Sequence, residues 1–224
     1  MTGTISMTQQ ASSEAVERRL RSEEVLTTDG VPIAEYLPVI ETEAESTLRT
    51  VDELARRALA LLIVAAKGAG MEQSQVEKLI ESYGIAADLS PEESAFAYDP
   101  MPSEDVRLQF NWRYEAAWPL LWALGYVEEL GKPDDTCDVQ LAVGLVRNRT
   151  TQQVIAGANL RPLREILDQA DLIYCYHWAV VDARINGRIA PAGLHPGVAY
   201  ERHYALNWMI GYEDQPWDEI STDT

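Results

Sequence analysis

The chain has 224 residues, 46% of them hydrophobic, and carries a formal net charge of −18 with a pI near 4.5. This length allows one large domain or two small ones around a substantial core. The charge excludes nucleic acid and an anionic membrane surface as partners, because both require a basic face on the protein. It would suit a basic protein partner.

The cysteines and the apolar segments predict a cytoplasmic protein. Cys137 and Cys175 are too few and too far apart for a disulfide framework, so reduced, buried thiols are expected. The polar N-terminus has no apolar segment of the secretory type. The longest apolar run, residues 59–66, is too short to cross a bilayer.

The N-terminal region predicts a polar, disordered segment at 1–12 ahead of a single domain at 13–224. Ser13 is a candidate cap for a helix running to about residue 26. The Asp29-Gly30 pair stops that helix. The prolines that follow make an extended connector, because a residue before proline avoids the α region.

Four helix signals follow in the middle of the chain. Residues 48–67 have apolar side chains at the 3.6-residue period, and residues 72–83 form a second amphipathic segment. Ser90-Pro91 starts a short helix. A longer helix is expected over 103–124, kinked or divided at Pro119.

A break at 131–135 is a possible sub-boundary within the domain. Asp134 or Asp135 is expected to cap a helix over 136–147, and residues 152–157 are short and ambiguous. No alternating strand pattern of useful length occurs. The sequence therefore predicts an all-α fold, a single compact multi-helix domain.

The last two helices, predicted over 161–186 and 197–212, hold His177 and His203, and His195 lies in the loop between them. Both helices are apolar almost all round, which predicts a buried C-terminal helix pair. Arginines and carboxylates are balanced within them. Since a buried charge must be paired, we expect arginine–carboxylate pairs between these two helices.

The histidines support two interpretations. In the first, His177 and His203 converge with Asp182 or Glu201 across the two helices and bind a metal or perform acid–base chemistry. In the second, each histidine fixes helix register by donating to a carbonyl or carboxylate. Because no recognised metal motif or phosphate-binding glycine loop is present, no metal and no cofactor are expected.

The same helices carry candidate ligand-binding side chains. Four aromatic residues would line a pocket between the two helices, and arginine and asparagine side chains would supply polar contacts. These candidate binding residues are Tyr176, Trp178, Arg184, Arg202, Tyr204, Asn207 and Trp208. The tail at 217–224 has an aromatic anchor and an acidic end, and it either folds back on the domain, which we expect, or binds a partner.

Several runs of the chain are shared with a known family. They are Arg161-Pro162-Leu163-Arg164-Glu165-Ile166-Leu167-Asp168-Gln169-Ala170-Asp171-Leu172, Tyr176-His177-Trp178-Ala179, Asp182-Ala183-Arg184, Glu201-Arg202-His203-Tyr204-Ala205-Leu206-Asn207-Trp208, Trp217-Asp218, Thr222-Asp223-Thr224, and upstream Gly30-Val31-Pro32-Ile33, Leu37-Pro38, Ala55-Arg56-Arg57-Ala58-Leu59 and Trp122-Ala123-Leu124-Gly125.

Over about residues 20–224 the chain resembles the bacterial family catalogued as domain of unknown function 4272. The resemblance implies a single, mostly helical bacterial domain with polar motifs near its end, and it brings no established activity. At Cys175 the chain departs from the resemblance, because arginine is expected there. The resemblance therefore implies no general role for the Cys175 thiol.

The leading interpretation is a non-enzymatic binding or accessory protein of the bacterial cytoplasm, with an acidic surface for a basic protein partner. One alternative is a hydrolase-like enzyme, with or without a metal, that uses His177, His203, Asp182 and Glu201. Another is a small-molecule sensor with an aromatic-lined pocket.

Overall fold

The computed structural model describes residues 7–34 and 36–224, and the side chains of 13–34 and 36–224. Of the predicted disordered segment, residues 1–6 lie outside the described residues. The first helix, α1, begins at Met7 and runs to Asp29, so it starts earlier than the predicted Ser13. It ends at Gly30, where a φ of +70° suits glycine.

Within the described residues every regular element is a helix, as predicted. The α-helices are α1 (Met7–Asp29), α2 (Val51–Gly68), α3 (Gln73–Tyr83), α4 (Pro91–Tyr98), α5 (Glu104–Asn111), α6 (Arg113–Ala123), α7 (Val139–Val146), α8 (Thr151–Ala156), α9 (Leu163–Ile185) and α10 (Pro196–Ile210). Short 3-10 turns occupy Pro191–Gly193, Tyr212–Asp214 and Trp217–Glu219.

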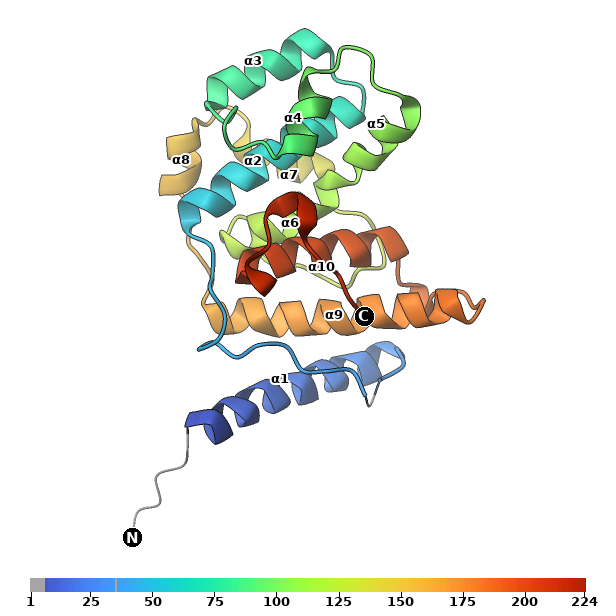
Figure 1. The fold of residues 1–224 in the computed structure, drawn as a ribbon. Helices are drawn as coiled ribbons and strands as arrows, with labels where there is room; N and C mark the ends of the chain where they lie inside the picture. Colours follow the sequence, from blue (N-terminus) through green and yellow to red (C-terminus); the bar gives the residue numbers. More distant parts are fainter. Residues whose placement is uncertain (1–6, 35) are drawn as a thin grey trace.

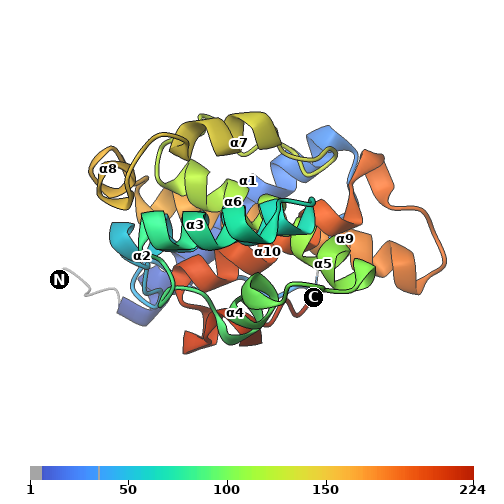
Figure 2. The same cartoon turned by 90° about the horizontal axis from the view of Figure 1, so that it is seen from above.

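The helices form successive layers. In Figure 1, α1 lies against α9, α10 follows with α6 behind it, and α2 to α5 form the far end. Seen from that far end, α7 lies along one edge, and α4 with the C-terminal segment lies along the other (Figure 2). One hydrophobic cluster includes residues on both sides of 131–135, so the helices form a single all-α domain. None of the described helices is long and apolar enough to span a membrane.

Side-chain caps set several helix starts. Ser90 Oγ accepts a hydrogen bond from the Glu93 N–H, and the Ser90 N–H donates to the Glu93 carboxylate, which confirms the predicted start of α4. The predicted helix over 136–147 is present as α7, but it begins at Val139 and is capped by Asp138, so the predicted start and capping residue were wrong. The preceding loop is held on other elements: the Cys137 N–H donates to Glu115 at 2.6 Å, and the His195 N–H donates to the Pro133 carbonyl at 2.8 Å.

The predicted break at Pro119 was also wrong. The chain turns at Trp112, between α5 and α6, whereas Pro119 lies inside α6. A proline inside a helix removes one backbone hydrogen bond, and α6 tolerates this because it is buried along its whole length. The Trp112 ring lies against Gly197 at the start of α10, where a Cβ would approach it to 3.0 Å.

Candidate functional site

Helix α10 lies in the middle of the molecule, and all its residues from Val198 to Ile210 except Tyr200 are buried. Two adjacent charges on α10 form ion pairs with α6. Glu201 Oε2 lies 2.9 Å from Arg113 Nη1, and Arg202 Nη2 lies 3.5 Å from Glu115 Oε2. These two pairs bind α10 to α6.

The prediction of arginine–carboxylate pairs between α9 and α10 was therefore wrong. The buried acid of α9, Asp171, pairs instead with Arg19 of α1 at 2.8 Å. The sequence pattern identified the buried charges, but the partner of each depends on which helix packs against that face. Arg202 also donates to the carbonyls of Leu130 and Gly131, so its guanidinium is committed to structure.

A hydrogen bond between two histidines joins α9 to α10. His177 Nδ1 and His203 Nδ1 are 2.9 Å apart, and the two residues are 6% and 2% exposed. A hydrogen bond between these nitrogens requires a proton on one and a lone pair on the other. Burial, with the nearby Arg184 charge, lowers the pKa of His177 to about 4. Burial and His177 lower the pKa of His203 to about 3, so both rings are neutral at pH 7.

A tyrosine from each helix packs on the histidine of the other. The Tyr174 ring lies 5.4 Å from His203, and the Tyr200 ring lies 5.7 Å from His177. Each helix carries the spacing Tyr-x-x-His, which places both side chains on one face. The two histidines therefore meet, as predicted, and each is also packed by a tyrosine from the opposite helix.

The predicted carboxylates do not join the histidines. Asp182 accepts from the Asn186 side chain at 2.9 Å and pairs with Arg188 at the end of α9. Glu201 is held by Arg113. Neither histidine hydrogen-bonds to a carboxylate of the described residues, and no group of three or more His, Cys, Asp or Glu side chains among them could hold a metal ion.

A cavity of about 530 Å³, the histidine cavity, opens beside His177. Its lining comes from the end of α9, the start of α10 and the turn before α6: Trp112, His177, Val180, Val181, Arg184, Arg188, Ala190, Pro196, Gly197, Tyr200 and Glu201. Arg188 is paired with Asp182, whereas Arg184 forms an ion pair with no described carboxylate. The cavity therefore combines apolar walls with an uncompensated positive charge.

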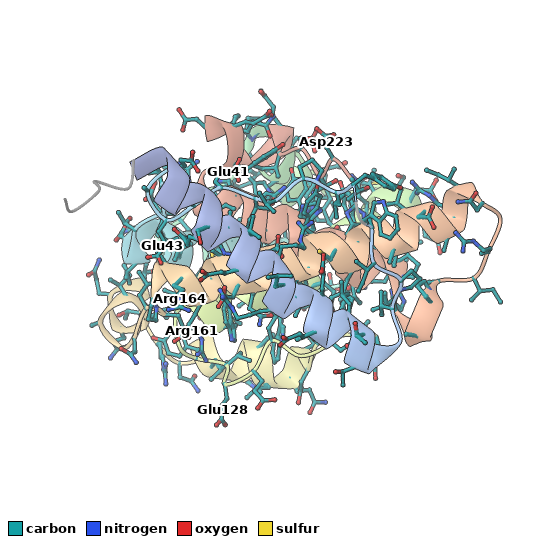
Figure 3. The ribbon with its side chains drawn as sticks, turned by 90° about the horizontal axis from the view of Figure 1, so that it is seen from below. Glu41, Glu43, Glu128, Arg161, Arg164 and Asp223 are labelled. Carbon is teal, nitrogen blue, oxygen red and sulfur yellow. The ribbon has the colours of Figure 1, made fainter. Side chains whose placement is uncertain are left out.

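A second cavity of about 280 Å³, the tail cavity, opens beside His203. It lies where the connector after α1 and the C-terminal tail meet α10, and it is lined by Pro38, Val39, Ile40, Glu41, Tyr174, His203, Asn207, Ile210, Tyr212 and Asp223. Figure 3 shows Glu41 and Asp223 on the same side of the molecule. The histidine pair thus has one cavity beside each of its rings.

The family model described as Domain of unknown function (DUF4272) matches residues 18–220. The chain belongs to this family. The predicted resemblance is confirmed. Neither the curated proteins nor the solved structures gave a significant match.

In this DUF4272 chain the four aromatic candidates do not share a pocket, so that prediction was wrong. Tyr176 donates to Asp29 of α1, and Trp178 packs edge-on against Tyr36. Tyr204 and Trp208 instead contact Trp217 of the tail. The positions at 176 and 178 lie on different sides of α9 because neighbours two residues apart on a helix do not share a face.

The tail itself docks, as expected, with Trp217 buried and the Tyr204 hydroxyl donating to its carbonyl. Of the polar candidates, Arg184 lines the histidine cavity and Asn207 lines the tail cavity. His195 caps α10, accepting from the Val198 N–H at 3.4 Å.

Sequence reasoning missed the tyrosines at the site, Tyr174 and Tyr200. The repeated Tyr-x-x-His spacing was the signal that could have identified both.

Proposed function

We propose that the protein acts by binding and that its ligand is a small organic anion in the histidine cavity. The guanidinium of Arg184, which forms no ion pair with a described carboxylate and lines a cavity of about 530 Å³, carries this proposal. Ligand sites for small molecules are apolar cavities of roughly 300–1,000 Å³ with a few polar groups that orient the ligand. The histidine cavity matches that description.

The residues around Arg184 suit an anion with an apolar or aromatic body. A guanidinium binds a carboxylate or phosphate through two parallel hydrogen bonds. Val180, Val181 and Pro196 supply apolar contacts, and Trp112 and Tyr200 supply ring faces and edges. His177 lies at the same cavity with its Nδ1 already used, which leaves Nε2 for the ligand.

The arrangement favours binding over hydrolysis. A histidine that acts as general base is normally oriented by a carboxylate on its second nitrogen. In this protein the second nitrogen contacts another neutral histidine, and the carboxylates Asp182 and Glu201 are held by arginines. Burial also lowers the pKa of His177 to about 4, which makes it a weak base at pH 7.

Titration of the full chain with benzoate, phenyl phosphate and neutral benzyl alcohol tests the proposal. We expect saturable binding of the anions and much weaker binding of the alcohol. Arg184→Ala should weaken anion binding by about tenfold or more, since a charge-assisted pair contributes roughly 1.5–3 kcal/mol. Absence of anion binding in the millimolar range would overturn the proposal.

Arg164→Ala is the matched control. It removes the same charge from the same helix, about 30 Å away because a helix rises ~1.5 Å per residue. Arg164 is exposed and lies near the other end of α9 (Figure 3). Anion binding should not change in this variant. Equal losses in both variants would reduce the effect to net charge and contradict a site at Arg184.

A basic protein partner is the second candidate, and the net charge of −18 favours it. We propose that such a partner is met in the bacterial cytoplasm, a compartment that suits the two free, buried cysteines. Affinity capture from native lysate should recover a basic protein at stoichiometric level that is released by high salt. A capture that recovers none would contradict this candidate.

A further inference from the structure

The tail cavity differs from the histidine cavity in the charge of its lining. Two carboxylates, Glu41 and Asp223, line it, and neither forms an ion pair or accepts a side-chain hydrogen bond among the described residues. No lysine or arginine is among its lining residues. These carboxylates also raise the pKa of Tyr212, after the larger effect of burial and the contribution of Glu213. The side chains that line the cavity therefore carry a net negative charge.

Two buried polar side chains face the tail cavity with an unused acceptor. Asn207 is 7% exposed, and its Nδ2 donates to the Ser221 carbonyl at 2.9 Å, while its Oδ1 accepts from no described donor. His203 uses Nδ1 for His177, and its Nε2 has no described partner. Both atoms remain accessible from the cavity. Asn207 Oδ1 accepts hydrogen bonds, and His203 Nε2 accepts them in the tautomer that carries its proton on Nδ1, so both suit a ligand that donates hydrogen bonds.

The aromatic side chains that line the tail cavity also favour a positively charged ligand. Tyr174 and Tyr212 contribute rings to the cavity, and the face of an aromatic ring attracts a cation. Arg19 lies 5.8 Å from the centre of the Tyr174 ring. Its guanidinium is committed to Asp171 and to the carbonyls of Leu37 and Pro38, so it does not neutralise the cavity carboxylates.

We propose that the tail cavity is a binding site for an organic cation, an alkylammonium or alkylguanidinium group. Such a group donates to the carboxylates of Glu41 and Asp223, to Asn207 Oδ1 and to His203 Nε2. The source is a free amine or a lysine or arginine side chain of a basic protein. This ligand and this cavity are distinct from the anion and the cavity of the proposed function.

The histidine pair connects the two sites. A cation that donates to His203 Nε2 requires the proton of His203 on Nδ1, which then donates to His177 Nδ1. The proton of His177 is then on Nε2, where it can donate to an anion in the histidine cavity. A cation in one cavity and an anion in the other therefore stabilise the same tautomer. This step rests on the proposed function, whereas the cation site does not.

Calorimetric titration of the full chain with butylammonium and butylguanidinium tests the site. We expect saturable binding at one site per chain, and a loss of about tenfold or more in the double variant Glu41→Gln/Asp223→Asn, because two charged acceptors are removed. Neither side chain has a described partner, so the variant should keep the wild-type unfolding midpoint.

Glu128→Gln/Glu129→Gln is the matched control, because it also removes two negative charges. Both residues are exposed, and Glu128 lies on the other side of α1 in Figure 3. It should leave the cation affinity unchanged. Binding that does not saturate, or that survives in the double variant, would overturn the site and leave only general attraction to an acidic protein. Loss of cation binding with intact benzoate binding separates this site from the proposed function.

A tetralysine peptide distinguishes the two sources. If the peptide binds more tightly than butylammonium and the double variant abolishes the difference, the cation comes from a basic protein. If the peptide binds no better than butylammonium, the cation is a free amine. Both results support the site, because both depend on Glu41 and Asp223. Peptide binding that is equal in wild type and double variant would contradict it.

Discussion

The two faces of α10 make opposite kinds of polar contact. Toward α6, adjacent charges form two buried ion pairs, Glu201 with Arg113 and Arg202 with Glu115. Toward α9, two neutral histidines share one hydrogen bond. In the ion pairs each charge is compensated within the protein, although Glu201 also lines the histidine cavity. The histidine pair is open, because each ring borders a cavity and its Nε2 has no hydrogen-bond partner among the described residues. The comparison separates polar groups that hold the fold from groups that we propose to bind ligands.

The largest effect should come from breaking an ion pair on the α6 side. Glu115→Ala leaves Arg202 buried without its carboxylate and removes the acceptor of the Cys137 N–H. Removing one partner of a buried pair typically costs about 3–5 kcal/mol. The free energy of unfolding from urea titration measures this loss. Glu129→Ala, an exposed position, should change it by less than about 0.5 kcal/mol. A similarly small change in Glu115→Ala would contradict a structural role for the ion pair between Glu115 and Arg202.

On the α9 side of α10, a substitution should lower the free energy of unfolding by less. His177→Ala or His203→Ala strands a neutral donor or acceptor, which costs about 1–3 kcal/mol, and leaves no buried charge. Thermal and urea unfolding of both variants beside Glu115→Ala measure the ranking. A histidine variant that loses as much stability as Glu115→Ala would show that the two faces of α10 do not differ in this way.

Acid should destabilise the protein through the histidine pair. The pKa values of His177 and His203 are lowered in the folded state, to about 4 and about 3, from 6.5. The unfolded chain therefore binds more protons below pH 6.5, and the stability present above that pH falls as the pH falls toward about 4. Each histidine contributes up to ~1.4 kcal/mol per pH unit. The double variant His177→Gln/His203→Gln should show a shallower fall between pH 6.5 and 4.5. Parallel curves for the variant and the wild type would contradict the account.

Local signals in the sequence predicted most of the helices and one contact of the site. The cap at Ser90 and the apolar stripe of α2 depend only on neighbouring residues, and both were read correctly. The apolar character of the last two helices likewise predicted a buried helix pair, and His177 and His203 meet within it. The break at Trp112 could not be read, because no proline or glycine marks it in the sequence, and its ring packs against Gly197, far along the chain. The tail cavity depends in the same way on residues as distant as Glu41 and Asp223.

The sequence also could not predict which helix packs against each face of α10. Glu201 and Arg202 are adjacent, and the sequence predicted that both are buried and paired. It did not predict that both face α6, since the rotation of a helix that is apolar on all sides cannot be read from its pattern. The sequence also did not predict that Asp182 lies apart from the histidines, because its ion-pair partner, Arg188, lies beyond the end of α9.

The protonation of the histidine rings tests the central claim most directly. Long-range proton–nitrogen NMR at pH 7 distinguishes the Nδ1–H from the Nε2–H form of each neutral ring. The account predicts complementary forms, one ring with its proton on Nδ1 and the other with its proton on Nε2, and a shift toward His203 Nδ1–H when butylammonium binds. Two rings in the same tautomer, or a charged ring at pH 7, would contradict the shared hydrogen bond and the link between the two cavities.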